Sequence, residues 1–159
     1  MEEEYLGVAR KKMLPLGLSN VDFVAGRAED VLLDRPFDCI ISSYLAKYAD
    51  LPALIAAARS MLRDGGTLVM HDFTYPRNRA FAALWSLHFV LLQTVGTRLY
   101  PQWQPAFDGL PALLRQSTWL QDLCELLRAN GFSGITVESL TFGAAAIVTG
   151  RKAGGKQGA

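Results

Sequence analysis

Hydrophobic and polar residues recur along this chain at two spacings, one helical and one extended. Helically spaced apolar positions over residues 2–16 predict a helix that Gly17 ends. Residues 21–24 predict a short strand. Residues 37–43, FDCIISS, predict another strand, and their apolar run without alternation is typical of a strand buried on both faces.

The next segment joins a helix to a strand that stops at an acid. Asp50 as N-cap and Pro52 in the first turn predict a helix over residues 51–62. Residues 59–76, RSMLRDGGTLVMHDFTYP, then contain the helix end, a Gly-Gly turn and a buried strand that stops near Asp72. Ligands bind at the carboxyl ends of the strands in open α/β sheets, so a site is expected there.

The following part of the chain is predicted to be mainly helical. An apolar helix is expected over residues 77–95 and an irregular stretch over residues 100–109, which holds two prolines. Ser117 or Thr118 caps a further helix, and Gly131 closes it.

The chain ends in a predicted β-hairpin of residues 135–140 and 144–149. The alternation of helices and strands predicts an α/β fold with a mostly parallel sheet, helices on both faces and an antiparallel hairpin at one edge. We assign residues 1–152 to one domain and residues 153–159 to a disordered tail.

Composition narrows the function classes. The 159 residues carry a net charge of +1, which gives no reason to expect a nucleic-acid partner. Cys39 and Cys124 both fall in apolar segments and are expected to be buried free thiols of a reducing compartment, the cytoplasm. The first twelve residues lack the apolar core of a signal peptide.

One apolar segment needs a separate interpretation. Residues 81–96, FAALWSLHFVLLQTVG, carry no formal charge, but they are shorter than the roughly 20 residues that span a bilayer. We interpret them as a buried or lid helix. Peripheral contact with a membrane surface remains open, and it requires Trp85 and Phe89 to be partly exposed.

Four segments in order resemble one known family. VDFVAGRAEDV at residues 21–31 resembles a segment after a third strand, and RPFDCIISSYLAKYAD at residues 35–50 resembles a fourth strand. RSMLRDGGTLVMHDF at residues 59–73 resembles a fifth strand, and residues 117–152 resemble a closing helix and hairpin. Together they look like a class I S-adenosylmethionine methyltransferase of the ubiquinone/menaquinone biosynthesis C-methyltransferase family.

The resemblance implies a Rossmann-like sheet with the strand order three-two-one-four-five-seven-six. The family's first two strands and its G-x-G-x-G loop have no counterpart after Met1. We therefore hypothesise a truncated or mis-started reading frame. Residues 37–43 would then form an open sheet edge, which invites pairing with another chain or self-association.

The resemblance also implies site residues. Cofactor-binding roles fall on Arg27, Ala28, Ser43 and Tyr44, and substrate-side catalytic roles fall on Asp72 and Lys47. Family members have Asp or Asn at the position of Arg27, and arginine cannot accept the hydrogen bond that those residues accept from adenine. Lys47 stands where the family has arginine and loses its planar fork.

Plainer interpretations stay open for the same residues. Asp72 can be only a strand-end cap, and Lys47 a solvated surface lysine. His71 suits a general base near neutral pH, although its apolar neighbours favour a packing role. The sequence contains no metal-ligand spacing and no P-loop.

The function expected is methyl transfer from S-adenosylmethionine to a small apolar, quinone-like acceptor. Such catalysis consists largely of positioning the two reactants, which fits the lack of a sharp catalytic motif. One alternative is a non-catalytic remnant that acts as a binding or assembly module through its open sheet edge. Another is a carrier of a small apolar ligand.

Overall fold

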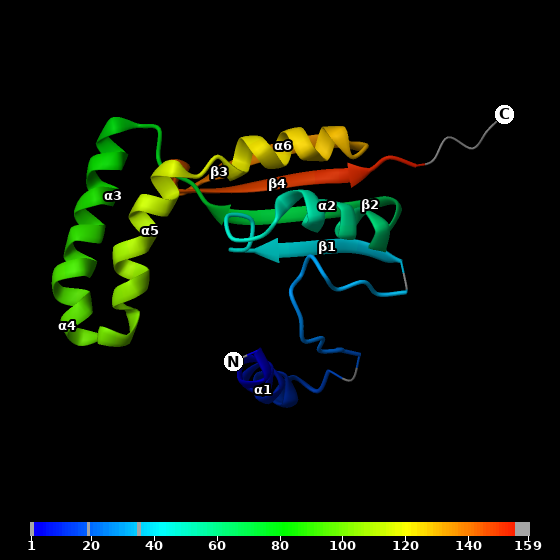
Figure 1. Ribbon diagram of the computed structural model, residues 1–159, viewed down its shortest axis with the longest axis horizontal. Helices are drawn as coiled ribbons and strands as arrows, with labels where there is room; N and C mark the ends of the chain where they lie inside the picture. Colours follow the sequence, from blue (N-terminus) through cyan, green and yellow to red (C-terminus); the bar gives the residue numbers. More distant parts are fainter. Residues whose placement is uncertain (1, 19, 35, 155–159) are drawn as a thin grey trace.

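The computed structural model describes residues 2–18, 20–34 and 36–154. Four strands form one sheet in the order β1-β2-β4-β3 (Figure 1). They are β1 (Phe37–Ser43), β2 (Leu62–Phe73), β3 (Phe132–Leu140) and β4 (Ala145–Lys152).

The strand order agrees with the last four strands of the expected sheet, four-five-seven-six. Only β1 and β2 run parallel, whereas β4 lies antiparallel to both β2 and β3. The described sheet is therefore mixed, and the expectation of a mostly parallel sheet was wrong. The terminal hairpin accounts for the difference, because β4 inserts between β2 and β3.

Two helices, α2 (Leu51–Met61) and α6 (Trp119–Ala129), cover one face of the sheet (Figure 1). Their apolar sides meet alternate residues of the central strands in one core, which includes Ile55, Leu123 and Met70. We expected helices on both faces; the described helices that pack on the sheet lie on one. The predicted cap of α2 is confirmed, since Asp50 accepts a hydrogen bond from the Ala53 N–H at 3.1 Å.

Strand β1 lies at the edge of the sheet. The side chain of Ile41 is 74% exposed and Cys39 is also exposed, so β1 is not buried on both faces and the buried thiol predicted at Cys39 was wrong. Among the described residues, no strand pairs with its outer edge. Cys124 is buried as predicted, and its burial raises the pKa of the thiol.

The Gly-Gly turn is part of strand β2. Its pairing register with β1 shifts between Phe37 and Cys39, which is the mark of a β-bulge. Gly65 takes a φ of +75°, a conformation that glycine adopts without strain. A Cβ on Gly66 would lie 2.8 Å from the Arg63 carbonyl oxygen, so the backbone passes too closely for a larger residue.

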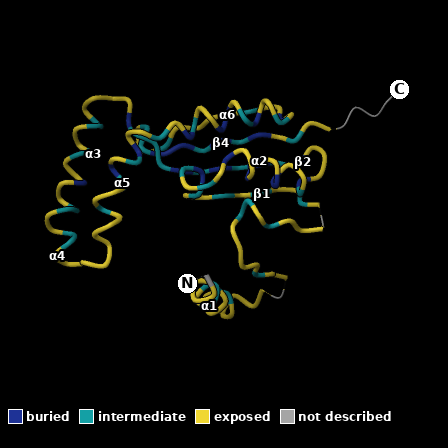
Figure 2. The backbone as a smooth tube through the Cα atoms, in the orientation of Figure 1, coloured by how far each residue is buried: buried dark blue, intermediate teal, exposed yellow. Residues whose placement is uncertain are grey.

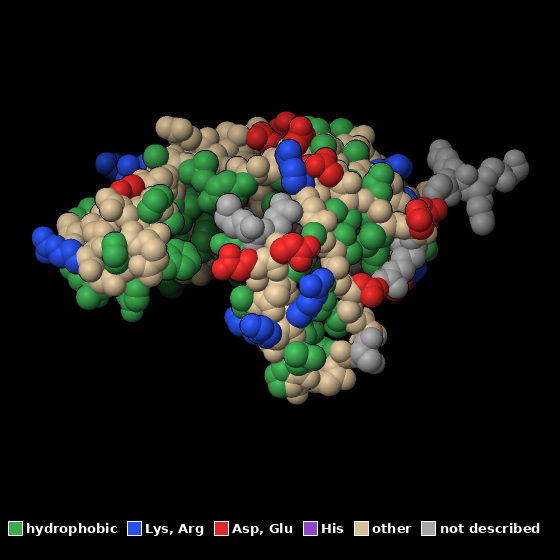
Figure 3. Space-filling view, turned by 60° about the horizontal axis from the view of Figure 1, so that its bottom comes forward, with side chains coloured by type: hydrophobic (Ala, Val, Ile, Leu, Met, Phe, Trp, Pro, Cys, Tyr) green, Lys and Arg blue, Asp and Glu red, His purple; other side chains and the backbone are tan. Residues whose placement is uncertain are grey.

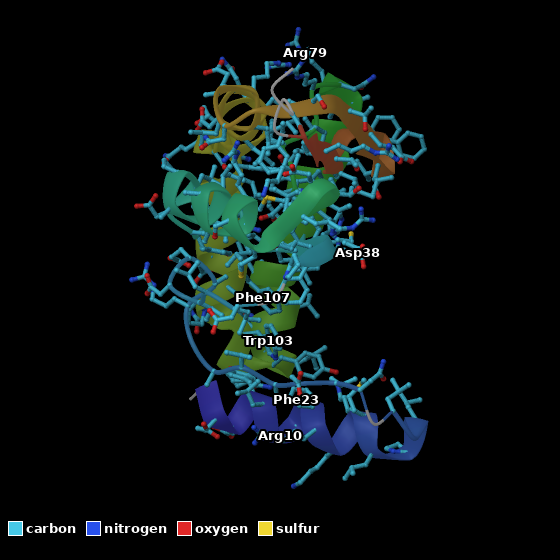
Figure 4. The ribbon with its side chains drawn as sticks, turned by 90° about the vertical axis from the view of Figure 1, so that its right-hand side faces the viewer. Arg10, Phe23, Asp38, Arg79, Trp103 and Phe107 are labelled. Carbon is cyan, nitrogen blue, oxygen red and sulfur yellow. The ribbon has the colours of Figure 1, made fainter. Side chains whose placement is uncertain are left out.

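The N-terminal segment lies apart from the core (Figure 2). Helix α1 (Glu2–Met13) continues into the 3-10 turn η1 (Leu14–Leu16), and Gly17 ends it with a φ of +62°, as predicted. The guanidinium of Arg10 lies 5.6 Å from the ring centroid of Phe23 (Figure 4). Residues 21–24 form no paired strand, contrary to the prediction.

A helical arm, residues 79–116, stands across the end of the sheet where β1 and β2 finish (Figure 1). It comprises α3 (Arg79–Leu91), the π-helical turn η2 (Leu92–Gly96), α4 (Thr97–Leu99), η3 (Pro101–Trp103) and α5 (Gln104–Gln116). The irregular stretch predicted at residues 100–109 was wrong, because α5 begins within it. Proline in the first turn of a helix lacks an N–H that would have no intrahelical partner, so Pro105 favours this start.

The base of the arm is fixed to the sheet. The indole N–H of Trp119 donates a hydrogen bond of 2.7 Å to the Phe73 carbonyl, which joins the residues just before and just after the arm. The ring of Phe81 stacks on Phe142 in the turn between β3 and β4, with centroids 4.2 Å apart. None of the residues of the core cluster lies in the arm.

Candidate functional site

The adjoining carboxyl ends of β1 and β2 bring Ser43 and His71 together. The two residues are direct partners in the parallel register, so both side chains lie on the same face of the sheet. The Ser43 hydroxyl lies 2.8 Å from His71 Nδ1, within hydrogen-bonding distance. This face is the one that α2 and α6 leave uncovered; on it Ser43 is exposed and His71 is half-buried.

Tyr44 follows β1 in a conformation that is rare for a residue with a side chain. Its φ is +61°, and its N–H donates a hydrogen bond of 2.8 Å to the His71 carbonyl. Residues held in sparsely populated backbone regions concentrate at functional sites. The half-exposed Tyr44 ring lies 5.0 Å from the His71 ring and 4.7 Å from the Phe73 ring, between centroids.

Lys47 and Asp72 form a separate, buried pair. Successive side chains of a strand point to opposite faces, so Asp72 lies on the helix-covered face while His71 lies on the open one. The Lys47 ammonium contacts the Asp72 carboxylate, and the two side chains are only 2% and 0% exposed. The Phe73 N–H also donates to this carboxylate, at 2.7 Å.

Aromatic rings complete the surroundings of the lysine. Its Nζ lies 4.8 Å from the ring centroid of Tyr48, 5.5 Å from that of Phe73 and 5.8 Å from that of Tyr44. The lysine is therefore not the solvated side chain of the plainer interpretation. A catalytic role for Lys47 and Asp72 stays a prediction; their burial gives them a structural one.

Arg27 and Ala28 lie in the loop before β1. Ala28 packs against the core, whereas Arg27 is largely exposed and pairs with Glu29 through its Nη2, at 2.5 Å from Oε1. This contact raises the pKa of Arg27. The guanidinium therefore faces a carboxylate of its own chain, and the cofactor-binding roles of Arg27 and Ala28 stay predictions.

Protonation of Glu29 is expected to lower the free energy of unfolding at acid pH. Hydrogen bonds from its own backbone N–H and from Arg27 hold the pKa of Glu29 below 4.5. A carboxyl with a depressed pKa stabilises the fold above its unfolded pKa, and that stabilisation disappears as the pH falls through the folded value. We expect the difference in urea midpoint between wild type and Glu29→Gln to be largest near neutral pH and to vanish in the acid range; a difference that grows on acidification would contradict this.

A hollow lies on the other side of the sheet, the side that α2 and α6 cover. It measures about 800 Å³ between the start of α2 and α6, and its lining includes Lys47, Asp50, Asp122 and Glu125. Because it lies on the helix-covered face, it does not contain the Ser43–His71 pair. Among the described residues, no group of three or more His, Cys, Asp or Glu side chains is arranged to hold a metal ion.

Sequence reasoning missed the pairing of Ser43 with His71. It treated His71 as a packing residue because of its apolar neighbours in the chain. The register of two parallel strands was the missing information: had both strand ends been aligned, the two residues would have fallen on the same face.

Comparison with known proteins assigns the fold to a family. A sequence profile described as the ubiE/COQ5 methyltransferase family matches residues 1–152. The chain belongs to this family. The ubiE/COQ5 family uses S-adenosylmethionine as its methyl donor.

Two relatives show the extent of the similarity. The demethylmenaquinone methyltransferase of Geobacillus stearothermophilus is 26% identical over 152 residues, which cover 94% of this chain and 65% of that protein. The ubiquinone/menaquinone biosynthesis C-methyltransferase UbiE of Saccharophagus degradans is 28% identical over 156 residues, 96% of this chain and 62% of that protein. The chain thus spans somewhat less than two thirds of the length of these relatives.

Solved structures support the fold. The apo form of the S-adenosylmethionine-dependent methyltransferase SibL superposes with a TM-score of 0.63 at 18% identity, over 93% of this chain and 40% of that one. The N-methyltransferase NodS from Bradyrhizobium japonicum WM9, in complex with S-adenosyl-l-homocysteine, superposes with a TM-score of 0.52 at 12% identity. The match covers 91% of this chain and 61% of that one. At these identities the comparison shows the α/β fold alone and nothing about the substrate.

Proposed function

We propose that this chain takes part in S-adenosylmethionine-dependent methyl transfer to a ring carbon of a small apolar, quinone-like acceptor. The observation that carries the proposal is the accessible Ser43–His71 pair beside Tyr44, at the carboxyl ends of β1 and β2, in a chain that matches the family over residues 1–152. Ligands bind at this end of the strands in open α/β sheets.

The residues present fit the cofactor in part. The Ser43 hydroxyl and the Tyr44 ring offer a polar and a flat apolar contact at the strand end, whereas Ala28 packs against the core. Arg27 does not fit an adenine amino group, because a guanidinium only donates hydrogen bonds and this one pairs with Glu29. S-adenosylmethionine, when bound, supplies the methyl group from its sulfonium.

His71 is the candidate for moving the proton. Methylation of a ring carbon forms a carbon–carbon bond at the cost of a carbon–sulfur bond, and the ring must then lose a proton. An imidazole can take a proton as a general base, and the Ser43 hydroxyl lies 2.8 Å from Nδ1 of this one and orients the ring. The exposed Tyr44 ring would lie against a flat apolar acceptor.

The names of the relatives support the class of acceptor. The Geobacillus protein is named for demethylmenaquinone, and the Saccharophagus protein for ubiquinone and menaquinone biosynthesis. An apolar acceptor also agrees with the many exposed apolar and aromatic side chains around the arm.

The test is calorimetric titration of the chain with S-adenosylmethionine, followed by transfer of a labelled methyl group to a short-chain demethylmenaquinol. Ser43→Ala should weaken cofactor binding about tenfold, the cost of one hydrogen bond to a charged ligand. His71→Gln should lower kcat by roughly 100-fold and leave cofactor binding within twofold.

The matched control is Ser133→Ala, an exposed serine on β3 at the opposite edge of the sheet. It should change neither the affinity for S-adenosylmethionine nor kcat. Wild type that binds no S-adenosylmethionine, or a His71→Gln variant with full activity, would refute the proposed role.

A second candidate function rests on the edge of β1. Among the described residues no strand pairs with the outer edge of β1, and Ile41, on the open face of this strand, is 74% exposed. Open edges pair with other chains, so we also propose an assembly module that associates through β1. Ile41→Lys should abolish association seen by size-exclusion chromatography, whereas cofactor binding by a monomer would favour the enzyme.

A further inference from the structure

Phe89 is buried, so the membrane contact that the sequence interpretation required of Phe89 is wrong, but the outer side of the helical arm carries a different stripe of apolar side chains. Leu84, Leu87, Leu91, Val95 and Leu99 are each 50–68% exposed. Their spacing of three and four residues places them on one side of a continuous helix. Figure 3 shows hydrophobic side chains gathered over the arm, on the left, with a basic side chain at its outer end.

The opposite side of the same helix packs on α5. Gln93 donates a hydrogen bond of 3.1 Å to the Phe107 carbonyl, and a Cβ on Gly96 would lie 3.1 Å from the Phe107 ring. Arg115 of α5 reaches Ser86 at 3.3 Å. The exposed stripe is therefore not an unfilled contact with α5, because that contact is already made on the other side.

Part of the stripe lines a groove. Leu84, Leu87 and Leu91 face Phe142 across an apolar hollow of about 440 Å³ at the base of the arm. The exposed Phe142 thus extends the apolar surface from the arm onto the turn between β3 and β4. Toward the tip of the arm, Trp103 exposes an amphipathic ring (Figure 4).

The charge of the arm is mainly basic. Residues 79–116 contain Arg79, Arg98 and Arg115 and a single acid, Asp108, so the arm carries a net charge of +2 in a chain whose net charge is +1. The first helix of the arm, Arg79–Leu99, has no Asp or Glu. Basic residues beside an exposed apolar stripe complement an anionic lipid surface.

The arm is long enough to cross a bilayer only in its first half. The helix Arg79–Leu99 has 21 residues and, by length and composition alone, could cross a bilayer. The returning helix α5 has 13 residues, or about 20 Å, against the roughly 30 Å of a hydrocarbon core. Because the Trp119–Phe73 hydrogen bond fixes both ends of the arm at one place, a crossing would need both helices to span.

We propose that the arm lies flat on an anionic membrane surface, with the stripe of Leu84, Leu87, Leu91, Val95 and Leu99 inserted among the acyl chains and Arg79 and Arg98 at the headgroups. Trp103 enters the interface at the tip. Such a position would present the sheet end with Ser43 and His71 to molecules dissolved in the membrane. The docking itself needs no cofactor and does not depend on the proposed methyl transfer.

The test is co-flotation of the full chain, without S-adenosylmethionine, with vesicles of phosphatidylcholine and phosphatidylglycerol at 3:1, compared with phosphatidylcholine alone. Wild type should float with the anionic vesicles, and its tryptophan fluorescence, the sum of Trp85, Trp103 and Trp119, should shift to the blue. Leu87→Glu/Leu91→Glu should weaken binding at least tenfold, and Arg98→Gln about fivefold on anionic vesicles only.

The control is Leu14→Glu/Val137→Glu, which adds the same charge and removes two exposed apolar side chains elsewhere. It should bind within twofold of wild type. Absence of flotation, or equal weakening by the control, would overturn the proposal. A dimer seen by light scattering that Leu87→Glu/Leu91→Glu converts to monomer, in protein that ignores vesicles, would also overturn it and would assign the stripe to a second copy of the chain.

Discussion

Replacing Lys47 by methionine is expected to lower the free energy of unfolding by about 3–5 kcal/mol. The substitution keeps the apolar stem but removes the ammonium that neutralises Asp72, whose side chain is fully buried. An unpaired carboxylate in that place cannot be solvated, and the backbone N–H groups of Phe73 and of residue 47, which still donate to it, do not replace a charge. Urea unfolding followed by circular dichroism measures the change.

A double variant distinguishes the loss of one partner of the ion pair from the loss of both charges. Lys47→Met/Asp72→Leu removes both charges, and we expect it to recover most of the loss, because apolar replacements of a buried ion pair are often neutral or stabilising. Arg63→Met is the surface control: the Arg63–Asp38 pair is more than half exposed on both sides and should be worth no more than about 1 kcal/mol. Equal losses for Lys47→Met and Arg63→Met would contradict the assignment of a buried pair.

Truncation of Trp119 to alanine is expected to cost about 3–5 kcal/mol. The indole is 3% exposed within the core cluster, and its N–H is the donor that holds the Phe73 carbonyl at the base of the arm. Trp119→Phe keeps much of the packing but leaves that carbonyl without its donor, and it should cost about 1–3 kcal/mol. Both values come from urea unfolding.

Trp103→Ala is the matched control for Trp119, since it removes the same ring from an exposed position in the arm. It should change the free energy of unfolding by no more than about 0.5 kcal/mol. If Trp119→Phe were as stable as wild type, the hydrogen bond to Phe73 would not be part of what fixes the arm.

Local rules predicted most of the elements. Asp50 and Pro52 marked the start of α2, Gly17 and Gly131 marked helix ends, and the hairpin followed from its turn. These signals depend on a few adjacent residues, so they can be recognised without knowing the three-dimensional structure. The ordered set of segments likewise gave the family correctly.

The wrong or missing predictions concern burial and contacts, which depend on where other parts of the chain lie. Residues 37–43 are apolar enough for a buried strand, but burial depends on what lies beside a strand, and β1 is at the edge. Residues 100–109 contain prolines that break a helix in its interior but begin one in its first turn. Lys47 and Asp72 lie 25 residues apart, so only the fold reveals that each neutralises the other.

The separation between the arm and the core cluster has a consequence for how the molecule responds to stress. Because no residue of the arm belongs to the core cluster, the contacts that hold the sheet, α2 and α6 together are expected to survive when the arm opens. Segments with few shared buried contacts unfold locally as cooperative units of their own. The arm can therefore vary in sequence, length or orientation at little thermodynamic cost to the rest of the fold, provided that the junction between Phe73 and Trp119 is kept.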